Sequence, residues 1–207
     1  MTPEDFAARF SVSRETLGLL ERYAALLGRW QKAQNLIAAA SLDEVWSRHF
    51  ADSAQLLKLA PEARRWLDLG SGAGFPGMVI AILLKGREGA AVDLVEANAR
   101  KCAFLNAVRR ETAAPARVHA MRIEEAANHL KGPFDIVTAR ALAPLVELAP
   151  LIAPFLTGPA RALLPKGRDV ERELTAASID WNIACDTFES LTDPQGRILM
   201  VHKLQRR

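Results

Sequence analysis

The sequence is poor in cysteine. Its two cysteines, Cys102 and Cys185, form no CxxC pair and belong to no Cys/His cluster with the spacing of a zinc site. This pattern excludes a disulfide scaffold and a zinc module, and isolated cysteines are typical of a chain in a reducing compartment. We therefore predict a cytoplasmic protein with no bound metal.

Long apolar runs are absent as well. The longest, residues 78–84, is far too short to span a bilayer, and the acidic N-terminus lacks the apolar core of a signal peptide. Neither positive nor negative charge is in large excess, because the net charge is +3. This small positive charge is compatible with an anionic partner but does not require one. Of the 207 residues, 50% are hydrophobic and 25% are charged, so we expect a globular protein with a full core and no membrane contact.

Residues 1–60 are expected to form a helical extension. Apolar residues between Leu19 and Trp30 recur on one helix face, and Ser13 is a suitable N-cap for that helix. A second helical stretch is predicted over residues 42–59, with a break at the capping pair Asp52-Ser53.

From residue 61 the pattern changes to alternating strands and helices, which predicts a separate α/β domain over residues 61–207. Five strand–helix units followed by a hairpin indicate a doubly wound, largely parallel sheet with an antiparallel end. Ligands of such sheets bind at the carboxyl ends of the strands. The expected strands are 66–69, 91–95, 117–121, 134–139, 160–164, 181–188 and 197–203, and the expected helices are 76–84, 98–110, one from 124, 145–155 and 169–177.

A glycine-rich loop follows the first expected strand and has two interpretations. Residues 72–77 match GxGxxG, the dinucleotide fingerprint, whereas Asp68, Gly70, Gly72 and Gly74 match the DxGxGxG loop of class I S-adenosylmethionine methyltransferases. A dinucleotide loop faces an anionic pyrophosphate, whereas S-adenosylmethionine is a sulfonium with an ammonium group. An acid before the loop suits the cation, so Asp68 favours S-adenosylmethionine.

Two further positions fit a bound nucleoside. Glu96 closes the second strand, where a carboxylate accepts hydrogen bonds from ribose hydroxyls of either cofactor. Ile123 and Glu124 follow the third strand, at a position that commonly flanks adenine. Each also has a plain structural interpretation, as a solvated charge or as the start of a helix.

Two missing motifs reduce the number of chemical groups that could accept the methyl group. Residues 138–144 lack the Asn/Asp-Pro-Pro-aromatic motif of amino-methylating enzymes, and neither cysteine lies in the Pro-Cys or Thr-Cys pair used to attack pyrimidines. What remains is an acceptor that is already nucleophilic, such as guanine N7, or one activated elsewhere. Guanine N7 carries no proton, so its methylation needs no general base.

Several separated stretches are informative together, namely residues 30–36, 48–53, 68–77, 139–141 and 166–167. In these stretches, and in their order, the sequence resembles the bacterial 16S ribosomal RNA guanine-N7 methyltransferases of the small ribosomal subunit, also called the glucose-inhibited division protein B family. The resemblance covers nearly the whole chain, although family members often have Thr where this chain has Ile37.

The resemblance implies methyl transfer from S-adenosylmethionine to N7 of a guanine in 16S ribosomal RNA. It implies cofactor contacts at Gly70, Phe75, Ile123, Glu124 and Arg140, with Glu96 at the ribose. His49, Arg140 and Asn35 are the expected catalytic residues: His49 would orient the guanine or contact a phosphate, and Arg140 would bind the cofactor carboxylate or an RNA phosphate.

Two residue assignments stay open in the sequence. Asp52 would either accept a hydrogen bond from guanine or, as we favour, cap a helix. Lys166 would either contact an RNA phosphate or remain a solvated lysine.

We expect the substrate to be 16S ribosomal RNA within the small ribosomal subunit or its precursor. The alternative functions are an NAD-dependent oxidoreductase and a non-catalytic nucleotide-sensing or RNA-binding protein. The basic residues considered for the RNA footprint are Arg29, Lys32, Arg48, Arg100, Lys101, Arg109, Arg110, Lys166 and Arg168.

Overall fold

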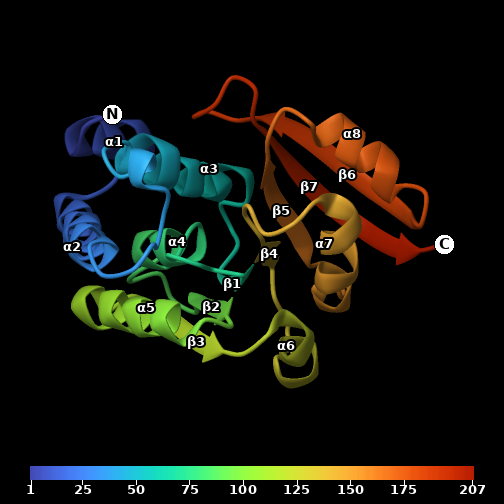
Figure 1. Ribbon diagram of the computed structural model, residues 1–207, viewed down its shortest axis with the longest axis horizontal. Helices are drawn as coiled ribbons and strands as arrows, with labels where there is room; N and C mark the ends of the chain where they lie inside the picture. The colour runs from blue at the N-terminus through green and yellow to red at the C-terminus, as the bar shows by residue number, and fades with distance from the viewer.

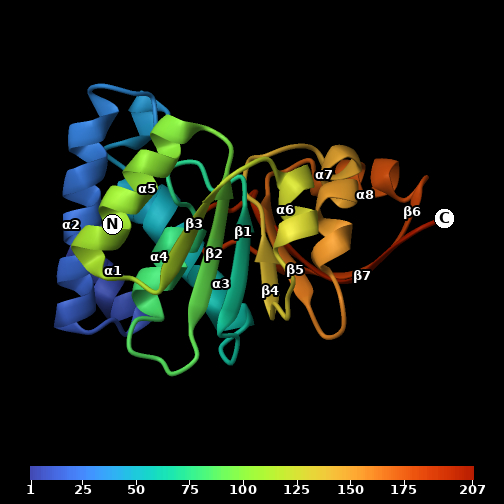
Figure 2. The same ribbon diagram turned by 90° about the horizontal axis from the view of Figure 1, so that it is seen from below.

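A seven-stranded sheet organises the computed structural model, which describes residues 1–207. Its spatial order is β3-β2-β1-β4-β5-β7-β6 (Figures 1 and 2). The strands are β1 (Arg65–Leu69), β2 (Ala91–Glu96), β3 (Ala116–Ala120), β4 (Ile136–Thr138), β5 (Arg161–Lys166), β6 (Trp181–Glu189) and β7 (Arg197–Arg206).

The first five strands are parallel, and β7 inserts antiparallel between β5 and β6. The predicted terminal hairpin is therefore confirmed, and it adds two antiparallel strands to an otherwise parallel doubly wound sheet. The fourth strand is the main difference from the prediction. It pairs over only three residues, instead of the expected 134–139, which brings Arg140 into a loop just beyond its carboxyl end.

Helices cover both faces of the sheet. The N-terminal helices lie with α4 and α5 on one side, and α6, α7 and α8 lie on the other (Figure 2). No helix is long and apolar enough to cross a membrane. The helices are α1 (Pro3–Phe10), α2 (Arg14–Gln31), α3 (Asp52–Leu59), α4 (Gly77–Leu83), α5 (Ala99–Thr112), α6 (Ile123–His129), α7 (Leu145–Ile152) and α8 (Val170–Ala177), with short 3-10 helices at Ala39–Ser41 and Ala153–Phe155 and a π-helix at Val45–Ala51.

Alternation along the strands divides the core in two. In β1, Trp66 faces the α4–α5 side, whereas Leu67 and Leu69 face the α6–α8 side. The strands carry apolar residues on both faces because successive side chains point to opposite sides and both sides are covered by helices. This double burial explains the apolar runs from which the strands were predicted.

The N-terminal helices share one core with the sheet. Ser13 caps α2 as predicted, with its Oγ accepting from the Thr16 N–H at 3.1 Å. Leu20 and Leu27 of α2 are buried in the same cluster as Trp66 of β1. The predicted boundary near residue 60 falls between α3 and β1, and apolar packing is continuous across it.

The predicted helix break at Asp52-Ser53 is wrong. The π-helix Val45–Ala51 runs directly into α3, and neither side chain caps it. Ser53 Oγ instead donates back to the His49 carbonyl at 2.6 Å. The same carbonyl also accepts from the Asp52 N–H, so it has two donors where the π-helix meets α3.

Tyr23 joins the N-terminal helices to the glycine-rich loop. Its fully buried hydroxyl donates to the Ala73 carbonyl, and its ring packs on Phe50 and Phe75. We expect Tyr23→Phe to lower the free energy of unfolding by about 1–2 kcal/mol, because it leaves that carbonyl without a donor. Urea denaturation measures the loss.

A matched control for this variant is Thr112→Val, which removes another buried hydroxyl, one that donates to Val108 within α5. Both variants should be destabilised, but only Tyr23→Phe should weaken cofactor binding, because only Tyr23 holds the glycine-rich loop. Equal cofactor affinity in the two variants would show that the Tyr23 hydroxyl does not shape that loop.

Candidate active site

The glycine-rich loop turns sharply between β1 and α4. Gly70 and Gly72 have φ angles of +68° and +57°, a region that side-chain-bearing residues rarely adopt. The Ser71 N–H donates to the Val95 carbonyl at 3.0 Å, which ties the loop to the end of β2. The loop backbone is therefore exposed to a ligand lying over the carboxyl ends of β1 and β2.

Asp68 supports this loop from beneath. Its side chain is 1% exposed, accepts from Thr138 Oγ1 at 2.8 Å and from the Gly77 N–H at 3.2 Å, and does not line the adjacent cavity. Burial raises the pKa of the Asp68 carboxyl to about 6, against hydrogen bonds from Thr138 and Gly77 that lower it. Direct contact between Asp68 and the cofactor stays a prediction; in the structure the carboxyl fixes the start of α4.

A cavity of about 490 Å³ opens over the loop, at the edge of the sheet where the cofactor is predicted to bind. Of the predicted cofactor residues, Gly70, Gly72, Phe75, Glu96, Ile123, Glu124 and Arg140 line it, whereas Asp68 and Gly74 do not. Glu96 is 9% exposed, and its two carboxylate oxygens accept from the Gly72 and Asn98 N–H groups, each at 2.8 Å.

The lining of this cavity fits S-adenosylmethionine. The positive-φ glycines leave room for close approach of a ligand to the backbone, and the Glu96 carboxylate has further acceptor capacity for ribose hydroxyls. Ile123 and Met121 add apolar surface for an adenine ring. Three cationic side chains, Lys101, Arg122 and Arg140, also line this cavity.

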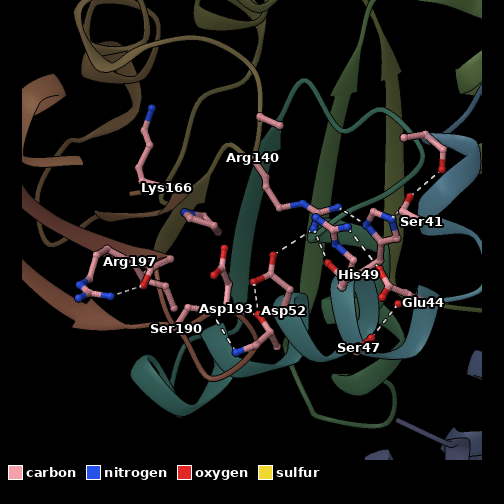
Figure 3. A pocket seen from close by; sticks show the side chains of 18 of the residues that line it. Ser41, Glu44, Ser47, His49, Asp52, Arg140, Lys166, Ser190, Asp193 and Arg197 are labelled. Atoms are coloured by element: carbon pink, nitrogen blue, oxygen red, sulfur yellow. Dashed lines mark hydrogen bonds and ion pairs between the residues drawn. The ribbon is translucent and has the colours of Figure 1, made fainter. Parts of the chain in front are cut away.

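A second, larger cavity of about 980 Å³, shown in Figure 3, shares part of its lining with the first. It is formed by segments far apart in the chain: residues 37–52, the loop after β4, residues 165–167 at the end of β5 with Glu173 of α8, and residues 190–198 of the β6–β7 loop and the start of β7. Lys166 and Arg197 line the side opposite His49 and Glu44 (Figure 3). This cavity combines charged side chains with a wide opening, and we call it the acceptor cavity.

Arg140 is the centre of the side-chain network in the acceptor cavity (Figure 3). Its guanidinium donates to Asp52 Oδ2 at 3.0 Å, to the Arg48 carbonyl at 3.0 Å and to His49 Nδ1 at 2.8 Å. It also lies over the Phe75 ring, 5.3 Å from the centroid. Arg140 thus joins the end of β4 to the π-helix and to the glycine-rich loop, and lines both cavities.

His49 is held in one protonation state. An arginine only donates, so Nδ1 accepts and the ring proton lies on Nε2, 2.9 Å from Ser41 Oγ. Burial, followed by the positive charges of Arg140 and Arg48, lowers the pKa of His49 to about 4. The ring stacks on Phe75 with centroids 4.7 Å apart. At neutral pH His49 is therefore an uncharged aromatic surface with both nitrogens engaged.

His49 and Asp68 make opposite contributions to the pH dependence of stability. The pKa of His49 is lowered from 6.5 to about 4, so its contribution is present above pH 6.5 and lost as pH falls through 4. The pKa of Asp68 is raised from 3.8 to about 6, so its contribution is present below pH 3.8 and lost as pH rises through 6. The two slopes oppose each other between pH 4 and 6.

We therefore expect the two single variants to diverge in this pH window. Relative to the wild type, the melting temperature of His49→Asn should rise as pH falls from 6.5 to 4, and that of Asp68→Asn should fall over the same range. Calorimetric scans across the window measure both slopes. Parallel pH profiles for the wild type and both variants would contradict the two pKa shifts.

Asp52 has a role that the sequence did not predict. Besides Arg140, it accepts at Oδ1 from Gln55 Nε2 at 2.8 Å and from Thr192 Oγ1 at 2.9 Å. Gln55, which is 2% exposed, also accepts from the Leu191 N–H at 2.7 Å. These bonds join α3 to the β6–β7 loop. Gln55 and Thr192 carried no sequence signal beyond the turn residues at 193–196.

The structure separates the remaining predicted residues. Asn35 is exposed and lines neither cavity, so its catalytic role stays a prediction. Lys166 is not a solvated lysine: its side chain is 8% exposed and donates to Glu173 Oε2 at 2.8 Å and to the Ala143 carbonyl at 3.0 Å. Of the other basic residues considered, Arg48 lines the acceptor cavity and Lys101 the cofactor cavity.

The chain matches one protein family over most of its length. The family model described as GidB, rRNA small subunit methyltransferase G, matches residues 16–197. A relative named ribosomal RNA small subunit methyltransferase G from Methylorubrum populi is 54% identical over 196 residues, covering 95% of this chain and 92% of the relative. One of the same name from Rhodospirillum centenum is 52% identical over 204 residues, covering 98% and 91%.

Solved structures share the fold at low sequence identity. Cofactor-bound Rv0187 from MTB gives a TM-score of 0.60 at 14% identity and covers 89% of each chain. A mutant of MtNAS in complex with S-adenosylmethionine gives a TM-score of 0.57 at 18% identity, covering 98% of this chain and 84% of that one. The class I methyltransferase fold predicted from the sequence is confirmed, and the chain belongs to the GidB family, rRNA small subunit methyltransferase G.

Proposed function

We propose that this protein transfers a methyl group from S-adenosylmethionine to N7 of a guanine in 16S ribosomal RNA. The observation that carries this proposal is the state of His49. It is the ring best placed to act as a base in the acceptor cavity, yet both its nitrogens are engaged within the chain. An acceptor with a free lone pair and no proton to remove, as at guanine N7, suits such a site.

The residues of the two cavities have different roles in the proposed reaction. When bound, S-adenosylmethionine supplies an electrophilic methyl group on a sulfonium. Glu96 and the glycine-rich loop bind and orient the cofactor from its nucleoside side. Arg140 and Phe75 hold the region between the cavities, and the neutral His49 ring on Phe75 offers a flat surface against which a guanine can stack. Alignment of the reactants for in-line attack then provides most of the rate.

The proposed substrate is the small ribosomal subunit or its precursor, which the enzyme would bind in the cytoplasm. The acceptor cavity is open, and Arg48 on its rim has a largely exposed side chain that can reach a phosphate. A guanine in such a particle must be extruded from its surroundings to enter the cavity. Binding should weaken steeply with salt, because phosphate contacts release counterions.

The alternative functions have less support. A nicotinamide enzyme would need a proton donor beside the ring, and the sole tyrosine, Tyr23, is fully buried and bonded to the glycine-rich loop. The family match favours methyl transfer over nucleotide sensing.

The test is transfer of labelled methyl from S-adenosylmethionine to small subunits from cells that lack this protein, followed by nucleoside analysis. We expect label in 7-methylguanosine. Label in another nucleoside would refute the N7 assignment, and cofactor binding without any label would favour a sensing role.

A further inference from the structure

The two cavities meet along four residues that line both of them: Ile37, Arg140, Ala141 and Leu142. We call this set the junction. With the cofactor in one cavity and the base in the other, as the proposed function requires, the methyl group crosses between them at the junction. Arg140 is fixed there by its bonds to Asp52, His49 and Arg48. Ile37 comes from the segment that follows α2 and has a different support.

Ile37 lies in a stretch without regular secondary structure. Helix α2 ends at Gln31, and the next helical residue is Ala39. Within this stretch the N–H groups of Leu36 and Ile37 donate to a side chain, at 2.9 Å and 3.1 Å to Gln31 Oε1. The Gln31 amide also donates through Nε2 to the Ile37 carbonyl at 2.8 Å. One side-chain amide therefore holds both backbone groups of Ile37.

The chemistry of these three bonds requires an amide. Its oxygen accepts two N–H bonds while its nitrogen donates one, whereas a carboxylate has no donor and an apolar side chain has neither group. Leu36, held by the same amide, is 8% exposed and lines the cofactor cavity. Gln31 itself lines neither cavity, so it meets no ligand directly.

We propose that Gln31 is a positioning residue for methyl transfer, which fixes Ile37 at the junction so that donor and acceptor meet in line. It acts through the backbone of Ile37. Because a misplacement of about 1 Å at a reacting centre lowers the rate by up to about 100-fold, the loss of Gln31 should appear mainly in kcat. Binding surfaces on either side of the junction are largely made by other residues, so the KM values should change little.

The experiment compares steady-state kinetics of intact variants, with S-adenosylmethionine and unmethylated small subunits as substrates. For Gln31→Leu we expect kcat to fall about 10- to 100-fold, with each KM within about threefold of the wild type. Gln31→Glu keeps the acceptor for both N–H groups and loses the donor to the Ile37 carbonyl. Its kcat should therefore lie between that of the wild type and that of Gln31→Leu. Gln34→Leu is the matched control, because only the backbone N–H of Gln34 is engaged, with Trp30.

Three results would overturn this role: a wild-type kcat in Gln31→Leu, a raised KM with unchanged kcat, or an equal loss in Gln34→Leu. If Gln31→Leu does not fold, Gln31→Glu decides the question, and a wild-type kcat in that variant overturns the role. A wild-type protein that forms no 7-methylguanosine would refute the proposed function instead, so the two failures are distinguishable.

Discussion

Arg140→Ala should nearly abolish methyl transfer, with kcat lowered by on the order of 100-fold or more. The variant loses the contacts to His49, Asp52 and the Arg48 carbonyl together, and with them the wall shared by the two cavities. It also leaves the Asp52 carboxylate, 15% exposed, without its charge partner, which should cost about 3 kcal/mol of stability. Single-turnover kinetics on small subunits and urea denaturation measure the two effects.

A second substitution separates activity from stability in this experiment. Adding Asp52→Asn to Arg140→Ala neutralises the unpaired carboxylate and keeps an oxygen to accept from Thr192. We expect the double variant to regain much of the lost stability and none of the lost kcat. Arg140→Lys should also remain poorly active, since an ammonium cannot reproduce the planar set of donors. Recovery of kcat together with stability would show that Arg140 is only structural.

Glu96→Ala should weaken S-adenosylmethionine binding by about 100-fold, because it removes a charged acceptor that serves the ribose in our proposal. The same carboxylate accepts from the Gly72 and Asn98 N–H groups, so the glycine-rich loop also loses a support. Isothermal titration with the cofactor measures the change in Kd, and the melting temperature reports the loss of loop support.

Two further variants define what Glu96 contributes. Glu96→Gln keeps one acceptor oxygen of similar reach and should give an intermediate Kd. Glu125→Ala removes an exposed acid from the first turn of α6 that does not line the cofactor cavity, so its Kd should equal that of the wild type. A wild-type Kd for Glu96→Ala would rule out a ribose contact at this position.

The central strands β1, β2, β4 and β5 could be predicted because they are largely buried on both faces and are bounded by turn residues. The terminal hairpin followed from Asp193-Pro194-Gln195-Gly196, a strong turn sequence between two β-prone runs. The π-helix could not be predicted in the same way. Its residues have the composition of an ordinary helix, and the contacts that His49 and the following Asp52 make with the distant Arg140 leave no local pattern in the sequence.

The candidate site could be predicted only in part, for a related reason. Glu96 was found because it closes a strand and the ends of parallel strands meet at one edge of the sheet, whereas Arg140 was found through the family resemblance. The partners of Arg140 lie in other segments, 88 and 91 positions away for Asp52 and His49, and no local pattern links them. Gln31 and Gln55 were missed because a glutamine that bonds to distant backbone looks like any other polar residue in a helix.

The Asp52–Thr192 bond has a consequence for the newly made chain. Ribosomes deliver a protein from its N-terminus, and the residues of the cofactor cavity, 36–151, emerge well before Thr192. The residues of the cofactor cavity are therefore synthesised before the loop that completes the acceptor cavity, whereas β7, which contributes Ile198 and Leu199 to the two core clusters, is synthesised last. Premature termination at any codon between 152 and 189 would release a chain that has every residue of the cofactor cavity and lacks the loop that completes the acceptor cavity.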